Sequence, residues 1–425
     1  MVTHSKEDEV MVRCASLFSQ LVALFSRPQF YRLVKEHRAE RYSKGYSSWD
    51  HFVAMLFCQL AQAKSLREIC GGLACTMGKL RHLGMTDAPN KSTLSYANAH
   101  RPWQMFRDLF YETVKVCKMA APENRKFRFK NKLLSLDSTT LPGRQAGIAL
   151  CLSLFPWAEF RRTKGAVKLH LLLDHDGYFP TYAYISNGKK HDVTIARKVS
   201  LSPGSIVAMD RGYNDYRLFA TWTENRIYFV TRMKDNAQYT VIEDKTIPIT
   251  GNVLSDQLIQ FTGFNARKNC PYILRRVVVW DSENEREIVL LTNHLKFSPN
   301  TISAIYKDRW QIELFFKALK QNLKIKTFVG TTENALYIQI WTACLPVRQA
   351  LIAMLLIKYL QFKSKFGWSL SNLVAFLRWN LFTYRDLWDW IDNPFDVLPL
   401  VPVPVQYKLP FHGLGQQVYN QKNIT

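Results

Sequence analysis

The chain has 425 residues, of which 57 are Lys or Arg and 34 are Asp or Glu, so its formal net charge at pH 7 is +23. With 47% hydrophobic and 13% aromatic residues it can bury a core, which excludes disorder as its main state. Its length predicts two or three domains. A surface this basic indicates a polyanionic partner: nucleic acid first, and an anionic membrane surface second.

The membrane alternative is the weaker one. The most apolar stretch, Ala350 to Ile357, lies between Arg348 and Lys358 and has only eight residues, whereas a spanning helix needs about 20. The N-terminal residues lack the cationic start and apolar core of a signal peptide. The eight cysteines are scattered without a CxxC pair, which is typical of reduced thiols in a cytosolic protein. We therefore expect a cytoplasmic protein with no membrane partner.

The positive charge is unevenly distributed along the chain. Residues 1–130 carry +10 and residues 131–200 carry +5, whereas residues 201–300 carry only +1 and residues 301–425 carry +7. The near-neutral block is what a structural insertion would show.

The first 120 residues have helical patterns. Apolar residues recur at helical spacing in 10–25 and 49–61. Ser65 and Glu68 have the spacing of a capping box, and Asn90 or Ser92 begins a polar, basic helix that ends near Arg101. A helix, a turn and a polar helix are compatible with a helix-turn-helix that reads a major groove, and equally with an ordinary helical bundle.

From about residue 126 the pattern changes to strands. Strands are expected at 132–137, 166–173, 179–185, 205–210, 227–232, 240–243, 273–280 and 286–292, with helices near 194–201 and 216–225. Helices resume at residue 301, and residues 394–410 are expected to form an extended tail. The turn at residues 174–177, Asp-His-Asp-Gly, carries metal-ligand residue types, but a simple hairpin turn is the favoured interpretation.

Two aspartates lie where acids are costly. Asp137 and Asp210 each lie in or at the end of a short apolar strand, where desolvation disfavours an unpaired carboxylate. Two such acids in a strongly basic protein indicate a divalent metal, as phosphodiester chemistry requires. Asp192 precedes a helical stretch, so it is either an N-cap or a further carboxylate near the site.

A third acid lies on a helix. At about 100° per residue, Arg309, Glu313 and Lys320 fall within roughly 60° of Tyr306. One helix edge therefore presents an aromatic ring, a guanidinium, a carboxylate and an ammonium together, which suits a metal ligand flanked by phosphate contacts. The alternative is an exposed helix with an i,i+4 pair of Arg309 and Glu313, contributing only about 0.2–0.5 kcal/mol.

The spacing Tyr306-(2)-Arg309-(3)-Glu313-(6)-Lys320 resembles the signature of DDE transposases of the fourth insertion-sequence family. The segments that begin at Asp137 and at Asp210 are similar to the first and second acidic motifs of that family. The resemblance covers about residues 130–345, and the helical N-terminus only loosely.

This resemblance implies an α/β fold with three regions. Residues 1–125 would form an α-helical DNA-binding domain, and residues 126–345 an RNase H-like catalytic core with a β-rich insertion at about 226–298. Residues 346–425 would form C-terminal helices and the tail.

The resemblance also implies the roles of the site residues. Asp137, Asp210 and Glu313 would bind Mg²⁺, with Mn²⁺ as a substitute. Arg309 and Lys320 would hold phosphates of the element end, and Tyr306 would support a displaced nucleotide or phosphate.

The implied reaction is cut-and-paste transposition. A homodimer in the bacterial cytoplasm, associated with the nucleoid, would nick double-stranded DNA at terminal inverted repeats. The freed 3′-OH would form a hairpin, which is opened before strand transfer into target DNA. Hairpin formation needs a flipped base on an aromatic ring, for which Tyr213 and Trp280 are candidates. Two alternatives remain: a DNA-binding protein that is non-catalytic or has lost activity, and an RNase H-like nuclease without strand transfer.

Overall fold

The computed structural model describes residues 15–41, 43–76, 79–120, 126–142, 159–161, 164–322, 332–342 and 351–396. The first part of the helix expected at 10–25 and most of the tail expected at 394–410 lie outside these residues. Within the described helices, none is long and apolar enough to cross a membrane.

The N-terminal region is helical, as predicted. Its elements are α1 (Leu17–Ala23), α2 (Arg27–Glu36), α3 (Ser48–Leu60), α4 (Leu66–Ala74), the 3₁₀ helix η1 (Lys79–Leu83), α5 (Lys91–His100) and α6 (Trp103–Ala120). The Ser65 hydroxyl accepts a hydrogen bond from the backbone N–H of Glu68 at 3.1 Å, and Asn90 caps α5 by accepting from Thr93 at 2.8 Å. These side chains satisfy N–H groups that a helix start leaves free.

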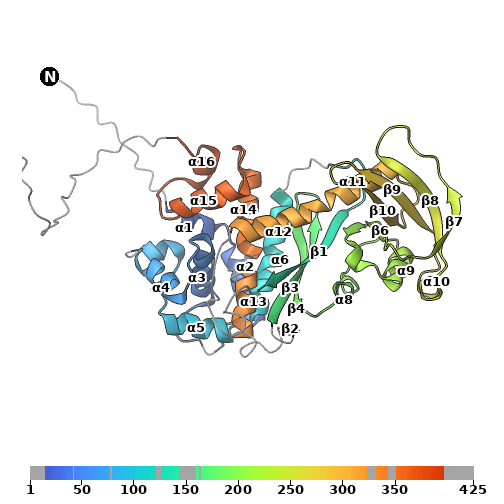
Figure 1. Cartoon of the computed structure of the whole chain (residues 1–425). Helices are drawn as coiled ribbons and strands as arrows, with labels where there is room; N and C mark the ends of the chain where they lie inside the picture. Colours follow the sequence, from blue (N-terminus) through green and yellow to red (C-terminus); the bar gives the residue numbers. More distant parts are fainter. Residues whose placement is uncertain are drawn as a thin grey trace, which may run out of the picture.

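The C-terminal helices return to the N-terminal ones. They are α13 (Glu333–Trp341), α14 (Leu351–Lys363), α15 (Leu370–Asn380) and α16 (Leu387–Asp392). Residues from both ends of the chain, such as Phe18 and Leu355, are buried in one core, and the Phe18 N–H donates to the carbonyl of Leu381 at 2.8 Å. Figure 1 shows the two sets of helices side by side at one end of the molecule.

The strands form one mixed sheet. They are β1 (Leu133–Pro142), β2 (Glu159–Arg161), β3 (Lys164–Asp174), β4 (Phe179–Asn187), β5 (Ile206–Met209), β6 (Tyr228–Arg232), β7 (Tyr239–Asp244), β8 (Val253–Phe261), β9 (Leu274–Asp281) and β10 (Arg286–Thr292). Their order is β2-β3-β1-β5-β6-β10-β9-β8-β7, with β4 paired to β3. β5 runs parallel to β1 and to β6, and the other pairs are antiparallel. The strands of the predicted insertion therefore continue the central sheet.

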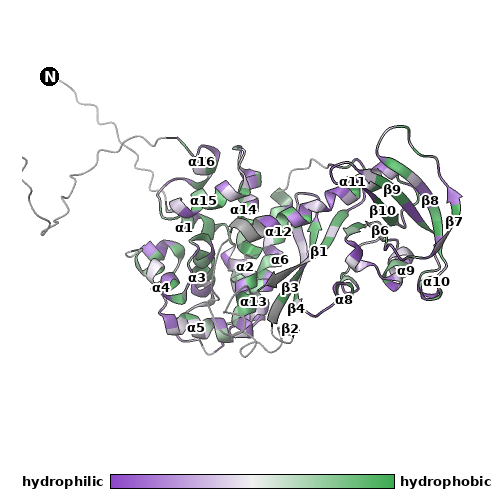
Figure 2. Cartoon of the chain, in the orientation of Figure 1, coloured by the Kyte–Doolittle hydropathy of each residue, from purple (hydrophilic) through white to green (hydrophobic). Residues whose placement is uncertain are grey.

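Helices cover both faces of this sheet. They are α8 (Asp192–Ala196), the 3₁₀ helix η3 (Arg211–Tyr213), α9 (Tyr216–Glu224), α10 (Phe264–Asn269), α11 (Pro299–Asp308) and α12 (Trp310–Asn322). Side chains alternate between the faces of a strand, so Val207 packs in the core with α9, whereas Ile206 packs in the core with α11. Hydrophobic and hydrophilic residues are interspersed along α11 and α12 (Figure 2), as expected for helices with one packed edge.

Candidate active site

Asp137 lies on β1, and Asp210 directly follows the adjacent parallel strand β5. The register of β1 and β5 pairs Leu133 with Ile206 and Leu136 with Met209, so one further step brings Asp137 opposite Asp210. Neighbouring strands lie about 4.7–4.9 Å apart. By alternation, both aspartates share the face of Leu133 and Ile206, which packs against α11. The two strand-borne acids therefore meet on the face that α11 covers.

Glu313 reaches the same place through Arg309. The Arg309 guanidinium donates to Glu313 Oε1 at 2.8 Å, and its Nη1 lies 3.7 Å from Asp137 Oδ2. Its side chain is only 10% exposed. Arg309 thus bridges an acid of β1 and an acid of α12.

The helix expected to continue through this segment is interrupted at Arg309. α11 ends at Asp308 and α12 begins at Trp310, although the backbone of Arg309 stays in the right-handed helical region. The Arg309 N–H is shared between the carbonyls of Ile305 and Tyr306 at 3.2 Å each. The regular ladder therefore loosens at the residue that contacts both acids.

The pKa of Asp137 lies above its ordinary value. The pKa of Asp137 is raised to about 6: burial is the largest cause, and the charges of Glu313 and Asp210 also raise it. A hydrogen bond from the Ser138 N–H, at 2.7 Å, and the charge of Arg309 act in the opposite direction. Like charges that raise a neighbour's pKa have to lie close to it, so all three predicted acids share one electrostatic environment.

The donor set suits a hard divalent cation. Carboxylate oxygens are the preferred protein ligands of Mg²⁺, which is bound by one or two carboxylates together with waters and substrate phosphates. Among the described residues, no group of three or more His, Cys, Asp and Glu side chains is arranged to hold a metal ion. Arg309 instead supplies positive charge between Asp137 and Glu313. Two aspartates in register therefore fit a cation, with Glu313 held nearby by Arg309.

The predicted DNA-contacting residues are placed differently from one another. Tyr306 is half-buried, and the Arg309 guanidinium lies 5.4 Å from its ring centroid. Burial raises the pKa of Tyr306, and Asp210 raises it further while Arg309 lowers it, so the ring belongs to the acid cluster. Lys320 is on α12, but its side chain lies outside the described residues.

Neither aromatic candidate for a flipped base presents a free ring beside the acids. Tyr213 is only 2% exposed, and burial, followed by the charges of Asp192 and Asp137, raises its pKa. Trp280 is 41% exposed, but by alternation it shares the β9 face of Leu274, opposite the face of Val277 that packs in the core with α11. Tyr213 therefore has a packing position, and Trp280 is accessible on the other face.

The structure adds one residue that the sequence patterns did not single out, and it decides between the two interpretations of Asp192. Trp310, which follows Arg309 directly, is 55% exposed, so it is an accessible aromatic side chain next to the site. Asp192 does not cap α8, because His191 holds that position. Instead Asp192 accepts hydrogen bonds from Ser138 at 2.8 Å and from Lys168 at 3.1 Å. The interpretation of Asp192 as an N-cap was wrong, and it contacts the residue that follows Asp137.

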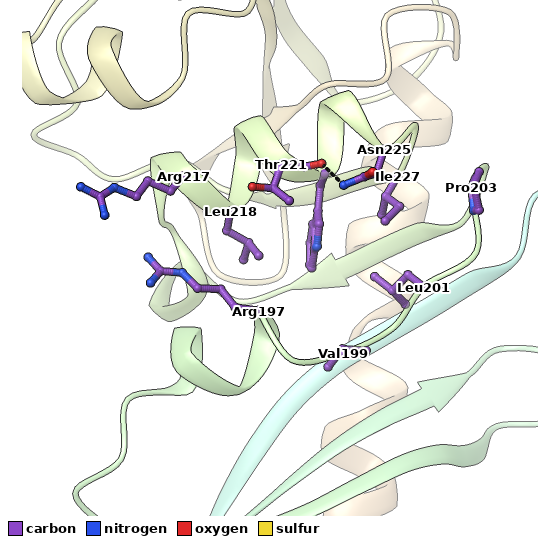
Figure 3. A pocket seen from close by; sticks show the side chains of 10 residues that line it. Arg197, Val199, Leu201, Pro203, Arg217, Leu218, Thr221, Asn225 and Ile227 are labelled. Atoms are coloured by element: carbon purple, nitrogen blue, oxygen red, sulfur yellow. Dashed lines mark hydrogen bonds between the residues drawn. The ribbon is translucent and has the colours of Figure 1, made fainter.

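A separate cavity of about 560 Å³ lies between residues 199–203 and α9. Figure 3 shows its apolar wall and, at one end, Arg197 and Arg217. Arg197 pairs with Asp215 at 2.7 Å, and none of the three predicted acids lines this cavity. The cavity is therefore distinct from the acid cluster.

Comparison with known families gives two matches. Residues 13–86 match a domain of unknown function, DUF4372, and residues 128–345, just over half of the chain, match the transposase DDE domain. The second match includes all three predicted acids.

Individual relatives agree with this match. A protein of Sinorhizobium fredii described as "Putative transposase y4zB" is 31% identical over 65% of this chain and 75% of its own length. A protein of Geobacillus stearothermophilus described as "Probable transposase for insertion sequence element IS5377" is 29% identical over 68% of this chain and 72% of its own length.

Among solved structures, a piggyBac transposase synaptic complex with hairpin DNA aligns with 86% of this chain and 79% of that chain. The sequence identity is 12% and the TM-score is 0.42, a likeness too weak to bear on function. On the domain match and the sequence relatives, the chain belongs to the DDE transposase family, whose members cleave and join DNA.

Proposed function

We propose that Asp137, Asp210 and Glu313 are the metal-binding acids of this transposase, in an RNase H-like core. The observation that supports this most is the register of β1 and β5, which brings Asp137 opposite Asp210 on the face covered by α11. Acids that desolvation disfavours are retained where chemistry needs them. The effect of Asp210 and Glu313 on the pKa of Asp137 agrees with a shared site.

The proposed metal is Mg²⁺, with Mn²⁺ as a substitute. Divalent cations bound by such acids stabilise the negative charge on the attacking and leaving oxygens of a phosphodiester. Arg309 contributes to the same site as a buried cation that neutralises Asp137 and Glu313. Its planar guanidinium also suits bidentate binding of a phosphate of the element end, as the spacing from Tyr306 to Lys320 suggests.

The proposed reaction is cut-and-paste transposition, as in the fourth insertion-sequence family. Hydrolysis at the element end frees a 3′-OH, which attacks the opposite strand to form a hairpin. After the hairpin is opened, the 3′-OH joins target DNA. The flipped base would stack on one of the two predicted rings: Tyr213, which is buried, or Trp280, which is exposed on the sheet face opposite the acids.

The proposed partners are paired element ends held by a homodimer. The basic N-terminal helices would supply end binding, and α5 offers an exposed polar face with Lys91, Tyr96 and His100. The Tyr96 and His100 rings stack at 4.0 Å. Substituting Lys91 and Tyr96 by Ala in the full chain is expected to weaken end binding and to lessen its salt dependence.

A cleavage assay on duplex DNA that contains the element's own end tests the site. Wild-type protein is expected to release a 3′-OH and to form hairpin ends with Mg²⁺, and to do neither with a chelator. Asp210→Asn should retain end binding and lose cleavage. The matched control is Asp244→Asn, an exposed acid on β7, at the far end of the sheet order.

Three outcomes would contradict parts of the proposal. Full cleavage by Asp210→Asn would remove Asp210 from the site. Cleavage without transfer to a target plasmid would favour the RNase H-like nuclease. Binding without cleavage by wild-type protein at any Mg²⁺ or Mn²⁺ concentration would favour the non-catalytic alternative.

A further inference from the structure

A second polar cluster, formed by Ser135, His175 and Asp308, lies next to the acids and plays no part in the proposed chemistry. The Ser135 hydroxyl lies 2.6 Å from His175 Nε2, and His175 Nδ1 lies 2.5 Å from Asp308 Oδ2. The Tyr178 hydroxyl donates to the same Asp308 oxygen at 3.2 Å, and Lys126 donates to the other oxygen. Burial raises the pKa of Asp308, but the hydrogen bonds from His175 and Lys126 outweigh it and lower the pKa overall.

The order serine, histidine, aspartate is that of a hydrolase triad, but this cluster is no acyl-transfer site. A nucleophilic hydroxyl has to reach a substrate carbonyl. Ser135 is 0% exposed, and the side chains of His175 and Asp308 are only 5% and 1% exposed. The hydrogen bonds therefore join parts of the protein to one another.

The parts that they join are those that carry the acids. Ser135 precedes Asp137 by two residues on β1, so both side chains point to the same face. Asp308 is the last residue of α11 and directly precedes Arg309. The backbone N–H of His175 also donates to the backbone carbonyl of Leu133, at 3.1 Å. His175 thus links the strand of Asp137 to the end of the helix from which Arg309 and Glu313 continue.

His175 joins two elements that are distant from it in the sequence. His175 lies in the β3–β4 turn, far along the chain from both β1 and α11. The other contacts of β1 with this segment include the longer one of Arg309 with Asp137, at 3.7 Å, and apolar packing, with Ile302 and Ile305 in the same core as Leu133. Apolar burial is non-directional, whereas charge-assisted hydrogen bonds have short, directional geometry.

We propose that His175 and Asp308 are positioning residues of the transposase reaction, which hold the Arg309–Glu313 segment against Asp137. This inference rests on the proposed function, because the relative positions of those acids matter only if they act together in cleavage. Displacing a catalytic group by about 1 Å costs on the order of a hundredfold in rate. Breaking the link should therefore slow cleavage without removing any group that contacts DNA or metal.

The test compares four full-length variants at saturating end DNA. His175→Ala removes the link and Asp308→Asn removes its charge, whereas His175→Gln can still donate to Asp308 and accept from Ser135 through its amide. Glu283→Gln is the matched control, because Glu283 pairs at 3.2 Å with Lys307, the neighbour of Asp308, with both side chains exposed.

The expected result has four parts. Single-turnover cleavage per folded molecule should fall roughly ten- to hundredfold in His175→Ala and Asp308→Asn, whereas the dissociation constant for end DNA should stay within about twofold of wild type. His175→Gln should recover most of the rate. The rise in melting temperature caused by Mn²⁺, which does not depend on cleavage, should be smaller in Asp308→Asn than in Glu283→Gln.

Other results would overturn the inference. Wild-type cleavage by Asp308→Asn, with Asp210→Asn inactive, would refute the positioning role and leave the proposed function intact. A His175→Gln rate as low as that of His175→Ala would also refute it, because the hydrogen bonds would then not matter. If Asp210→Asn itself cleaves, the proposed site is wrong before the positioning question arises. Should His175→Ala not fold, Asp308→Asn and His175→Gln decide the matter.

Discussion

Two buried arginines of this protein meet carboxylates in opposite ways. In the β-rich part of the sheet, Arg275 donates to both oxygens of Asp256, at 2.7 and 2.6 Å, and its Nη1 reaches the carbonyl of Leu295 at 3.3 Å. Beside the acids, Arg309 has a close contact with Glu313 and a longer one of 3.7 Å to Asp137. Its Nε is buried and has no hydrogen-bond partner among the described residues.

The difference is the one expected between a structural ion pair and a pair in the proposed active site. A buried charge needs good geometry and full hydrogen bonding to offset its desolvation. Arg275 and Asp256 meet that requirement within the fold, so nothing further has to bind. Arg309 is shared between two acids and keeps an unused donor, so a phosphate or a metal ion at the acids can change its partners. Incomplete pairing at a buried site is what a ligand would complete.

The largest effect is expected from Glu313→Gln. The change keeps the shape of the side chain but removes one proposed metal ligand, so Mg²⁺-dependent cleavage should fall about a thousandfold, or about 4 kcal/mol in activation free energy. Gel-based cleavage and end-binding assays measure it, and binding should be retained. Cleavage within a few fold of wild type would show that Arg309 and Glu313 form a structural pair too.

Breaking the pair of Arg275 and Asp256 should lower the stability of the fold and leave the cleavage activity unchanged. Asp256→Ala leaves the buried Arg275 charge without its carboxylate, which should lower the free energy of unfolding by about 3–5 kcal/mol. Urea denaturation measures this loss. The fraction that remains folded should cleave DNA at the wild-type rate, and an unchanged unfolding midpoint would contradict the assignment.

A smaller effect on cleavage is expected when Arg309 keeps its positive charge but loses its planar guanidinium. Arg309→Lys cannot contact Asp137 and Glu313 in the same way, so cleavage should fall roughly ten- to hundredfold. Arg275→Lys is the matched change in the pair of Arg275 and Asp256, and it should lower the unfolding midpoint with little effect on cleavage. If both substitutions act only on stability, the contrast between the two arginines fails.

The smallest effect is expected at an exposed pair. Lys307 and Glu283 are 82% and 75% exposed, and water screens such contacts, so Glu283→Gln should change the free energy of unfolding by less than about 1 kcal/mol. Thermal denaturation at low and at high salt measures it. A larger loss would mean that exposure alone does not rank the ion pairs of this protein.

Much of the fold could be predicted from sequence patterns. The helices at 48–60 and 91–100 and the β3–β4 hairpin follow from apolar periodicity and from turn and cap residues. β8 was missed: its register shifts between Val253 and Ser255, and it buries Asp256. A strand with an irregular step and an inward-facing acid lacks the alternation on which prediction depends.

The candidate site was predictable in its members but not in its contacts. The position of Asp137 and Asp210 in apolar runs and the spacing from Tyr306 to Lys320 are local features. That Arg309 bridges two of the acids depends on how α12 meets β1. The turn at 174–177 was predicted as a turn, which the hairpin confirms, but its link to Asp308 joins residues 133 positions apart.

The sequence by itself determined the chemistry available to this protein: a basic chain, three acids at special positions and helices with one packed edge. These properties follow from residue type and short-range spacing, which act within a few turns of chain. Only the tertiary structure decided that Arg275 is fully paired with Asp256, whereas Arg309 is shared between two acids. It also decided that His175 links β1 to α11, and that Tyr213 is buried while Trp280 is exposed. Such features depend on the register of strands and on the burial of charges, and both arise only when distant segments pack together.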